Sequence, residues 1–226
     1  MSHRKIAGIR ACVFDAFGTL FDVNSAAARE KATLGDHWQP LADVWRAKQL
    51  QYTWLRGLMR RHVDFWQVTG DALDFALAQT GVDAPALRER LMNLYLQLDA
   101  YPAVPETLRH LKERGFKLAI LSNGSPEMLA SAVENAGLAD LLDAVLSVEE
   151  VGTFKPDPVV YQLGVDRLEL PAGEMYFVSS NAWDACAAKA FGYQVVWCNR
   201  FGQPPERIPE TPDAEIRDLR GLLEQV

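Results

Sequence analysis

The stretch "VFDAFGTLFD", Val13–Asp22, carries an apolar run into a carboxylate and then turns on a glycine. The run begins a few residues earlier, at "RACVF", and its length and turn-forming boundary predict a buried strand. Asp15 therefore stands at the end of that strand, where polar side chains of open α/β sheets face ligands. Two residues later the chain has Phe17, at a position where a second acid would serve acid–base chemistry.

Four further runs of the same kind predict buried strands over residues 116–123, 142–149, 174–181 and 193–200. Helical segments begin between them, with Pro105 as a first helical residue and with Ser125 and Asp157 as caps followed by proline. Strand and helix thus alternate from about residue 105 onward, which is typical of a parallel sheet covered on both faces. The sequence predicts an α/β fold with a doubly wound parallel sheet, a Rossmann-like core.

The segment that follows the first strand breaks this alternation, because it contains helix-like patterns and no convincing strand. Apolar residues recur there at spacings of three and four. The four stretches with this pattern are residues 26–34, 41–61, 65–81 and 85–98. We therefore expect an inserted four-helix cap over residues 22–98, above the carboxyl edge of the sheet, and a Rossmann-like catalytic core made of residues 1–21 and 99–226.

The composition is that of an ordinary globular protein: of 226 residues, 49% are hydrophobic and 23% charged, and the formal net charge is −7. The negative charge argues against nucleic acid and anionic membrane surfaces as partners. The apolar run near the N-terminus is too short for a signal peptide or a membrane span. Cys12, Cys186 and Cys198 lie far apart without a CxxC pattern, which indicates reduced thiols and neither a disulfide framework nor a zinc site. We expect a cytoplasmic protein.

Polar residues close three of the predicted strands. They are Asp15, then Ser122 with Asn123, and finally Ser179, Ser180 and Asn181. Because the carboxyl ends of parallel strands meet at one edge of a sheet, we expect these side chains to converge on one site.

Four motifs resemble those of the haloacid dehalogenase superfamily, in order and at plausible separations. They are "DAFGTLFD", "LSNGSP", "FKPDPVVYQL" and "FVSSNAWDACAAKAFGY", and they cover the whole predicted core. Within that superfamily, Phe17, the "SSNAWD" block and the string "WRAKQLQYTWLR" resemble the L-2-haloacid dehalogenases. Most other members are magnesium-dependent phosphatases.

The residues themselves separate these two activities. A phosphatase of this type needs a second acid to protonate the leaving alcohol and further carboxylates to hold magnesium. Phe17 can do neither, and Asp184 is the one carboxylate in "SSNAWD", which leaves a poor set of ligands for a hard cation. A halide leaves without a proton, so the phenyl ring is compatible with displacement at carbon. We expect no metal and no cofactor.

The resemblance implies a nucleophilic mechanism in which Asp15 attacks C2 of a short L-2-haloacid and forms an ester, which water then hydrolyses to an inverted 2-hydroxyacid. Attack requires Asp15 to be ionised yet poorly hydrated, and Lys155 is implied as the neighbouring cation. Ser122, Lys155 and backbone N–H groups are implied to bind the substrate carboxylate. Arg46 and Asn123 match the residues that abstract the halide in the family.

The second half of the reaction is assigned in the same way. Asp184 is the implied base or orienter of the hydrolytic water, assisted by Asn181 and Thr19. Ser179 and Tyr161 match family positions that hold the charged groups in place. An apolar wall around the alkyl group and the halogen is expected from Phe17, Leu50, Phe65 and Trp183.

Two alternatives stay open on the sequence. One is a magnesium-dependent phosphatase of the same superfamily, and the other is a non-catalytic domain that binds a small carboxylate. The resemblance also implies a homodimer, for which the aromatic-rich string "QYTWLRGLM" of the cap offers an apolar patch.

Overall fold

A six-stranded parallel sheet forms the centre of the protein in the computed structural model, which describes residues 6–82 and 85–226. The strand order is β3-β2-β1-β4-β5-β6. The strands are β1 (Ala11–Phe14), β2 (Lys117–Ser122), β3 (Ala144–Ser147), β4 (Met175–Ser179), β5 (Gln194–Cys198) and β6 (Ala214–Ile216). This confirms the predicted doubly wound α/β fold and the five predicted strands. The sixth strand, which is only three residues long, was not predicted from the sequence.

The first strand occupies the middle of the sheet. β1 pairs with β2 on one side and β4 on the other, with Phe14 opposite Ile120 and Val178. All four residues of β1 are fully buried. Since these strands run parallel and in close register, their carboxyl ends lie side by side, which brings the residue after Phe14 next to the ends of β2 and β4.

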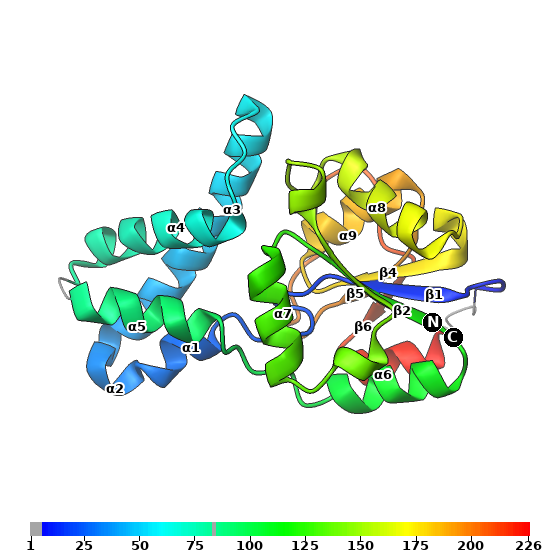
Figure 1. Cartoon of the computed structure of the whole chain (residues 1–226), viewed down its shortest axis with the longest axis horizontal. Coiled ribbons are helices and arrows are strands. Elements are labelled where there is room, and N and C mark those ends of the chain that lie inside the picture. Colours follow the sequence, from blue (N-terminus) through cyan, green and yellow to red (C-terminus); the bar gives the residue numbers. More distant parts are fainter. Residues whose placement is uncertain (1–5, 83–84) are drawn as a thin grey trace.

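Helices cover both faces of the sheet (Figure 1). α8 and α9 pack together on one face, and α6 and η5 pack together on the other, where α7 also lies. These elements are α6 (Val104–Glu113), α7 (Pro126–Asn135), α8 (Pro158–Leu168), α9 (Ala182–Phe191) and the 3-10 helix η5 (Leu219–Glu224). Ser125 and Asp157 cap α7 and α8 through their side chains, as predicted. Shorter 3-10 turns are η2 (Ala139–Leu141), η3 (Val148–Glu150) and η4 (Ala172–Glu174).

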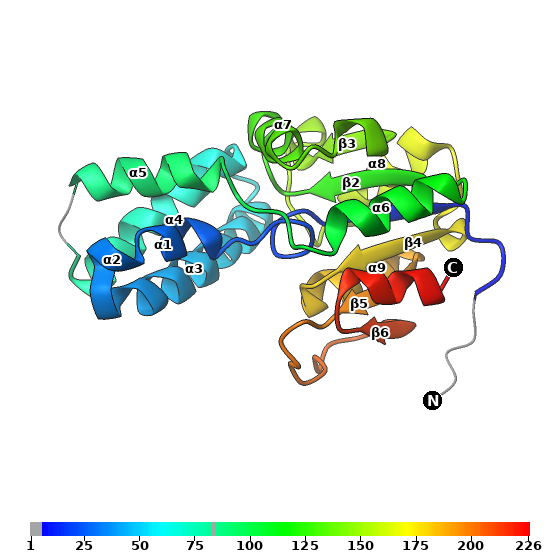
Figure 2. The same cartoon turned by 90° about the horizontal axis from the view of Figure 1, so that it is seen from below.

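The chain between β1 and α6 is helical and gathers beyond one end of the sheet (Figures 1 and 2). It contains α1 (Ser25–Arg29), α2 (Lys31–Leu34), η1 (Gly35–His37), α3 (Trp38–Met59), α4 (Phe65–Thr80) and α5 (Pro85–Tyr95). The helix expected over residues 26–34 is instead two short helices, because Glu30 leaves the helical backbone conformation with φ −95° and ψ 12°. Residues 1–5 of the predicted core and residues 83 and 84 of the predicted cap lie outside the described chain.

Two chain crossings join these helices to the sheet, and they run side by side. The backbone N–H of Asp22 donates to the carbonyl of Asp99 at 2.8 Å, and the N–H of Tyr101 donates to the carbonyl of Leu20 at 3.0 Å. Figure 2 shows both crossings between the helices and the strands. The chain therefore leaves the sheet for the helical segment and returns from it at neighbouring points.

Two further sequence expectations concern membrane-spanning helices and the state of the cysteines. No helix within residues 6–82 and 85–226 has the length and apolar character that a bilayer crossing needs. Cys12, Cys186 and Cys198 are free thiols, and all three are buried.

Candidate active site

Asp15 lies at the carboxyl end of β1 and is held by hydrogen bonds to both carboxylate oxygens. Its Oδ1 accepts from Lys155 Nζ at 3.1 Å. Its Oδ2 accepts from Thr19 Oγ1 at 3.0 Å and from Asn181 Nδ2 at 2.9 Å. Only 6% of the residue is exposed, so the carboxylate is stabilised by fixed donors and not by bulk water.

Lys155 joins two carboxylates in the interior. Its ammonium group donates to Asp184 Oδ2 at 2.9 Å as well as to Asp15, and it lies 4.9 Å from the centre of the Phe177 ring. Burial is the largest influence on the pKa of Lys155 and lowers it, but the two carboxylates together outweigh burial and raise the pKa above its ordinary value. Lys155 is therefore a buried, permanently charged ammonium at neutral pH.

Asp184 is fully buried on the first turn of α9, and both of its oxygens are used. Oδ2 accepts from Lys155, and Oδ1 accepts from the hydroxyl of Tyr161 at 2.7 Å. Burial raises the pKa of Asp184, an effect that Lys155 only partly opposes. Burial likewise raises the pKa of Tyr161, and the neighbouring Asp184 adds to the increase, so the phenol stays protonated and donates to the carboxylate.

The turn between β4 and α9 presents Asn181 to Asp15. The hydroxyl of Ser179 accepts from the backbone N–H of Asn181 at 3.1 Å, and the N–H of Ser180 donates to Thr19 Oγ1 at 2.8 Å. Thr19 thus bridges the turn and Asp15. Ser179 therefore holds the turn that carries Asn181, and its implied role in holding the charged groups in place stays a prediction.

The end of β2 brings Ser122 and Asn123 to the same edge. The hydroxyl of Ser122 accepts from the backbone N–H of Gly124 at 3.1 Å. The side-chain oxygen of Asn123 accepts from the backbone N–H of Lys155 at 3.0 Å, so Asn123 fixes the loop that delivers the ammonium. Both residues are more than nine-tenths buried.

Arg46 reaches the site from α3. Its Nη2 donates to the carbonyl of Phe17 at 3.1 Å and to Asn181 Oδ1 at 3.3 Å. Its Nη1 donates to Gln49 Oε1 at 2.7 Å, and Gln49 is itself buried with its amide donating to Thr69 Oγ1 at 2.8 Å. The guanidinium therefore spans the boundary between the helices and the sheet with fixed orientation.

Gln49 and Tyr95 belong to this network and were not identified from the sequence. The Tyr95 hydroxyl donates to Gln49 Oε1 at 3.2 Å, the oxygen that also accepts from Arg46. A usable signal exists for Gln49, because it lies three residues after Arg46 and is a polar residue in an otherwise apolar helix pattern. Tyr95 offers no comparable signal, since an aromatic residue in a helix normally belongs to the core.

An apolar wall closes the site on the helical side. The ring of Phe17 stacks on Phe65 at a centroid distance of 5.9 Å and lies 5.8 Å from the ring of Tyr95. Phe17 and Phe65 are almost completely buried. Leu50 is half-buried on α3 one turn beyond Arg46, which places the two on the same helix face.

Trp183 lies apart from this wall, on α9 between Asn181 and Asp184. Its ring meets Trp54 of α3 edge-on, at 5.3 Å between centroids. Both tryptophans line a cavity of about 570 Å³ that Lys155 also borders. The indole Nε1 is buried and has no hydrogen-bond partner among the described residues.

The donors and acids of the site do not suit a divalent cation. Asp184 already accepts from Lys155 and Tyr161, and Asp15 accepts from three donors, so the ammonium fills the position between the two carboxylates. Within the described chain, no group of three or more His, Cys, Asp or Glu side chains is arranged to hold a metal ion. Magnesium prefers an octahedral set of oxygen ligands, which these hydrogen-bonded carboxylates do not offer.

The arrangement can support nucleophilic chemistry by a carboxylate. Asp15 lies beside a fixed cation, an arginine is directed at the same region, and Phe17 stands two residues after Asp15, where an acid would serve as proton donor. Such a site favours a leaving group that departs as a stable anion.

One family profile and several known proteins match this chain over most of its length. A family profile described as haloacid dehalogenase-like hydrolase matches residues 9–192. The (S)-2-haloacid dehalogenase of Pseudomonas sp. (strain YL) is 46% identical over 217 residues, which make up 96% of this chain and 94% of that protein. The (S)-2-haloacid dehalogenase 1 of Pseudomonas sp. (strain CBS-3) is 49% identical over 199 residues, 88% of each chain.

A solved structure with a covalently bound small molecule is also similar. It is the L-2-haloacid dehalogenase from Xanthobacter autotrophicus with chloropropionic acid covalently bound. That protein is 37% identical to this chain, and the match covers 96% of this chain and 97% of the other with a TM-score of 0.89.

Proposed function

This chain belongs to the family of haloacid dehalogenase-like hydrolases, and from that premise we propose that it hydrolyses short-chain L-2-haloacids to D-2-hydroxyacids. The observation that carries the proposal is the environment of Asp15, a buried carboxylate bound by one ammonium and two neutral donors, with a phenyl ring two residues later. The names of the curated relatives and the covalently bound chloropropionic acid of the Xanthobacter enzyme support it.

In the first step an oxygen of Asp15 attacks C2 of the substrate from the side opposite the halogen. The carbon–halogen bond breaks, the halide leaves with its electron pair, and an ester forms on Asp15. Arg46 and Asn123 stabilise the departing halide, and Ser122 and Lys155 bind the substrate carboxylate. Attack from the rear inverts the configuration at C2.

In the second step water attacks the carbonyl carbon of the ester, and the bond from that carbon to the bridging oxygen, which came from Asp15, breaks. One proton of the water goes to the departing oxygen and the other is released, which gives the hydroxyacid and restores the Asp15 carboxylate. Asp184 orients this water or accepts its proton, a role that its raised pKa favours. Asn181 and Thr19 donate to Oδ2 of Asp15 and stabilise charge that develops on the carboxyl group. Tyr161 and Ser179 hold Asp184 and the turn of Asn181 in position.

The apolar wall defines where the alkyl group and halogen bind. Phe17 and Phe65 form the part that is packed together by ring contacts. We assign Leu50 of α3 to the same pocket. We propose that Trp183 of α9, which lies apart from this ring stack, contributes from the cavity that Lys155 also borders. The wall excludes water, which would otherwise solvate Asp15 and weaken it as a nucleophile.

A magnesium-dependent phosphatase is the less favoured alternative. Its chemistry needs an acid near the leaving oxygen, and this chain has Phe17 at that position. Lys155 also holds the two carboxylates that would have to bind the cation.

The principal test is halide release from L-2-chloropropionate, measured with and without EDTA. We expect D-lactate as product and an unchanged rate in EDTA. Turnover that requires magnesium, or lactate of retained configuration, would contradict the proposal. Binding of 2-chloropropionate without any halide release would favour the non-catalytic alternative.

The nucleophile is tested in a single turnover in water labelled with heavy oxygen. Because water attacks the ester at the Asp15 carboxyl carbon, label enters Asp15 and not the first molecule of hydroxyacid. Label found directly in the product would instead indicate attack by water on C2. Asp15→Asn and Arg46→Ala are each expected to abolish most turnover.

The helical segment, residues 22–98, is assigned as the cap of this enzyme, with residues 1–21 and 99–226 as its catalytic core. Two observations support the division: the paired crossings at Asp22–Asp99 and Leu20–Tyr101, and the entry of Arg46 into the site from α3. We also propose a cytoplasmic enzyme, because its three buried cysteines are free thiols, which suits a reducing compartment.

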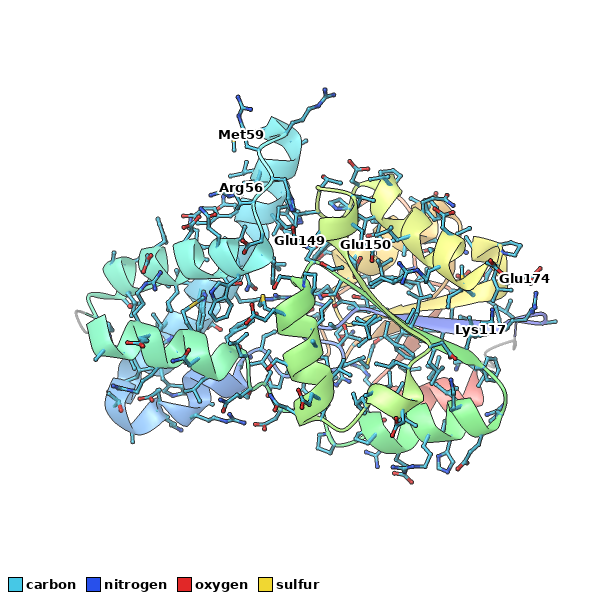
Figure 3. All side chains as sticks on the ribbon, in the orientation of Figure 1. Arg56, Met59, Lys117, Glu149, Glu150 and Glu174 are labelled. Carbon is cyan, nitrogen blue, oxygen red and sulfur yellow. The ribbon has the colours of Figure 1, made fainter. Side chains whose placement is uncertain are left out.

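A homodimer is proposed through the end of α3. Leu58 and Met59 are 83% and 61% exposed, and Trp54 and Leu55 are also accessible on the same helix. Figure 3 shows Met59 at the far end of α3, which extends beyond the neighbouring helices. A second copy would cover this apolar surface.

Sedimentation of the wild type at micromolar concentration should give twice the chain mass. Leu58→Glu should give one chain mass, whereas Val145→Glu, at an apolar position of edge strand β3 that is 37% exposed, should leave the dimer intact. A monomeric wild type would contradict the assignment.

A further inference from the structure

Arg200 connects two loops that form the site, although it does not touch the proposed pocket. It follows β5, and its guanidinium Nη2 donates to the carbonyl of Thr19 at 2.9 Å. Its Nη1 donates to Ser180 Oγ at 2.6 Å and lies 3.4 Å from the carbonyl of Gly18. The group therefore binds the loop after β1 and the turn after β4 at the same time.

The two loops that Arg200 binds also carry the residues that hold Asp15. Thr19 and Asn181 donate to Oδ2 of Asp15, and the backbone N–H of Ser180 donates to Thr19 Oγ1. Moving either loop by a fraction of an ångström would lengthen one of these hydrogen bonds. Misplacement of about 1 Å at a reacting centre costs roughly 100-fold in rate.

Arg200 also reaches the crossing where the chain returns from the helices to the sheet. Its guanidinium carbon lies 4.0 Å from the centre of the Tyr101 ring, and the backbone N–H of Tyr101 donates to the carbonyl of Leu20. A planar guanidinium can stack on a ring and donate in its own plane at once, which a lysine ammonium cannot do.

We propose that Arg200 is a positioning residue that fixes Thr19 and Asn181 on Oδ2 of Asp15 during ester formation and hydrolysis. Its hydrogen-bond partners among the described residues are carbonyl oxygens and a hydroxyl, and its guanidinium also lies over an aromatic ring. The inference rests on the proposed dehalogenase function, because its first test measures the rate of halide release.

The test compares Arg200→Ala and Arg200→Lys with the wild type for halide release from L-2-chloropropionate. Arg200→Ala is expected to lower kcat by roughly 10- to 100-fold while KM changes less than about threefold, since the residue lies outside the pocket. Arg200→Lys should fold normally and still lose part of kcat, because one ammonium cannot reach both loops. Guanidinium ion at millimolar concentration should restore part of kcat to Arg200→Ala and none to the lysine variant.

Arg217→Ala is the matched control. Arg217 donates to the carbonyl of Asn199, next to Arg200, but its side chain is 70% exposed. Among the described residues, its hydrogen-bond and ion-pair contacts are with Asn199 and Glu215 and not with Thr19 or Ser180. This variant should retain kcat within about twofold.

Two results of the activity measurements would overturn the proposal. One is a kcat within threefold of wild type in both Arg200 variants. The other is a loss that follows the loss of folded protein in thermal unfolding and does not respond to guanidinium. A crystal structure of Arg200→Lys provides a measurement that is independent of activity: the Asp15 contacts of Thr19 and Asn181 should be lengthened, and unchanged contacts would refute the positioning role even if the wild type released no halide.

Discussion

The ammonium group of Lys155 lies 3.1 Å from Oδ1 of Asp15, and only 1% of Lys155 is exposed. The same ammonium is 2.9 Å from Asp184. One cation therefore holds two buried carboxylates, and its removal leaves both of them without a charged partner.

Lys155→Met should destabilise the fold as well as stop turnover. Breaking a buried ion pair from one side costs about 3–5 kcal/mol of unfolding free energy. Loss of the cation should also lower kcat by roughly 10²- to 10³-fold or more. Urea unfolding and halide release measure the two effects.

Lys189→Met is the control for Lys155→Met. Lys189 pairs with Asp213 near the surface, where both side chains are about a quarter exposed, so its removal should cost about 1 kcal/mol or less. Equal destabilisation by the two substitutions would contradict the importance assigned to the buried ammonium.

The contribution of Lys155 should depend on pH in a defined direction. Its pKa is raised above 10.5 in the folded protein by the two carboxylates, which outweigh burial. Below about pH 10.5 the lysine is protonated in both folded and unfolded chains, so its stabilisation is complete. At higher pH the unfolded chain loses the proton first, and the stabilisation disappears as the pH passes the folded pKa.

The measurement is the difference in unfolding free energy between wild type and Lys155→Met. It should stay constant from neutral pH to about pH 10 and become smaller above about pH 10.5. A difference that grows with pH in the alkaline range would show that the sign is wrong.

Gly124→Ala should disturb the apolar wall. A Cβ at this position would overlap Cε2 of Phe17 and lie 3.1 Å from its Cζ, so the ring would have to shift from its stacked position on Phe65. Overpacking of this kind costs about 1–3 kcal/mol. We also expect a higher KM for 2-chloropropionate, measured by halide release.

Gly173→Ala separates this effect from a general effect of removing glycine. A Cβ on Gly173 would meet no atom within 4 Å, and the backbone there suits other residues. If both alanine variants behave like the wild type, Phe17 has room to move and the wall is less constrained than its contacts indicate.

Gln49→Leu should misdirect Arg46. The change removes the acceptor of Arg46 Nη1 and leaves Thr69 and Tyr95 without their buried amide partner, at a cost of about 1–3 kcal/mol. Because Arg46 is assigned to the leaving halide, the rate should fall more for 2-chloropropionate than for 2-bromopropionate, whose halide leaves more easily.

Gln51→Leu serves for comparison, because Gln51 is exposed on the same helix and contacts only Lys48 through its side-chain oxygen among the interactions described. It should leave both substrates unaffected. A uniform decrease for the two halogens in Gln49→Leu would instead indicate a general loss of structure.

The sheet could be predicted because each main strand is a continuous apolar run, as expected when both faces are covered. β6 escaped prediction because it has three residues and an exposed glutamate in its middle. The break at Glu30 also escaped, since the apolar spacing continues across it and the backbone change depends on local contacts. The strand-end acids and amides were found because parallel strands place them at one edge.

The supporting residues of the site are harder to predict. Gln49 offers only its spacing from Arg46 as a signal, and its other partners, Thr69 and Tyr95, lie on other helices. Arg200 has ordinary local surroundings in the sequence, and its partners lie on the loops after β1 and β4. Which distant atoms they meet depends on how the helices pack on the sheet, and no periodic pattern encodes it. The resemblance to known motifs identified Arg46, whereas spacing alone would have left it as one of several arginines on a helix.

The paired crossings at Asp22–Asp99 and Leu20–Tyr101 have an evolutionary consequence. A segment that leaves and re-enters a sheet at neighbouring points can lengthen, shorten or be exchanged without altering the register of any strand. Asp15, the proposed nucleophile, and Lys155 lie in loops of the part of the chain that contains the sheet, while Arg46, Leu50 and Phe65 belong to the segment. Substrate range can therefore diversify through that segment while the bond-forming chemistry is inherited unchanged.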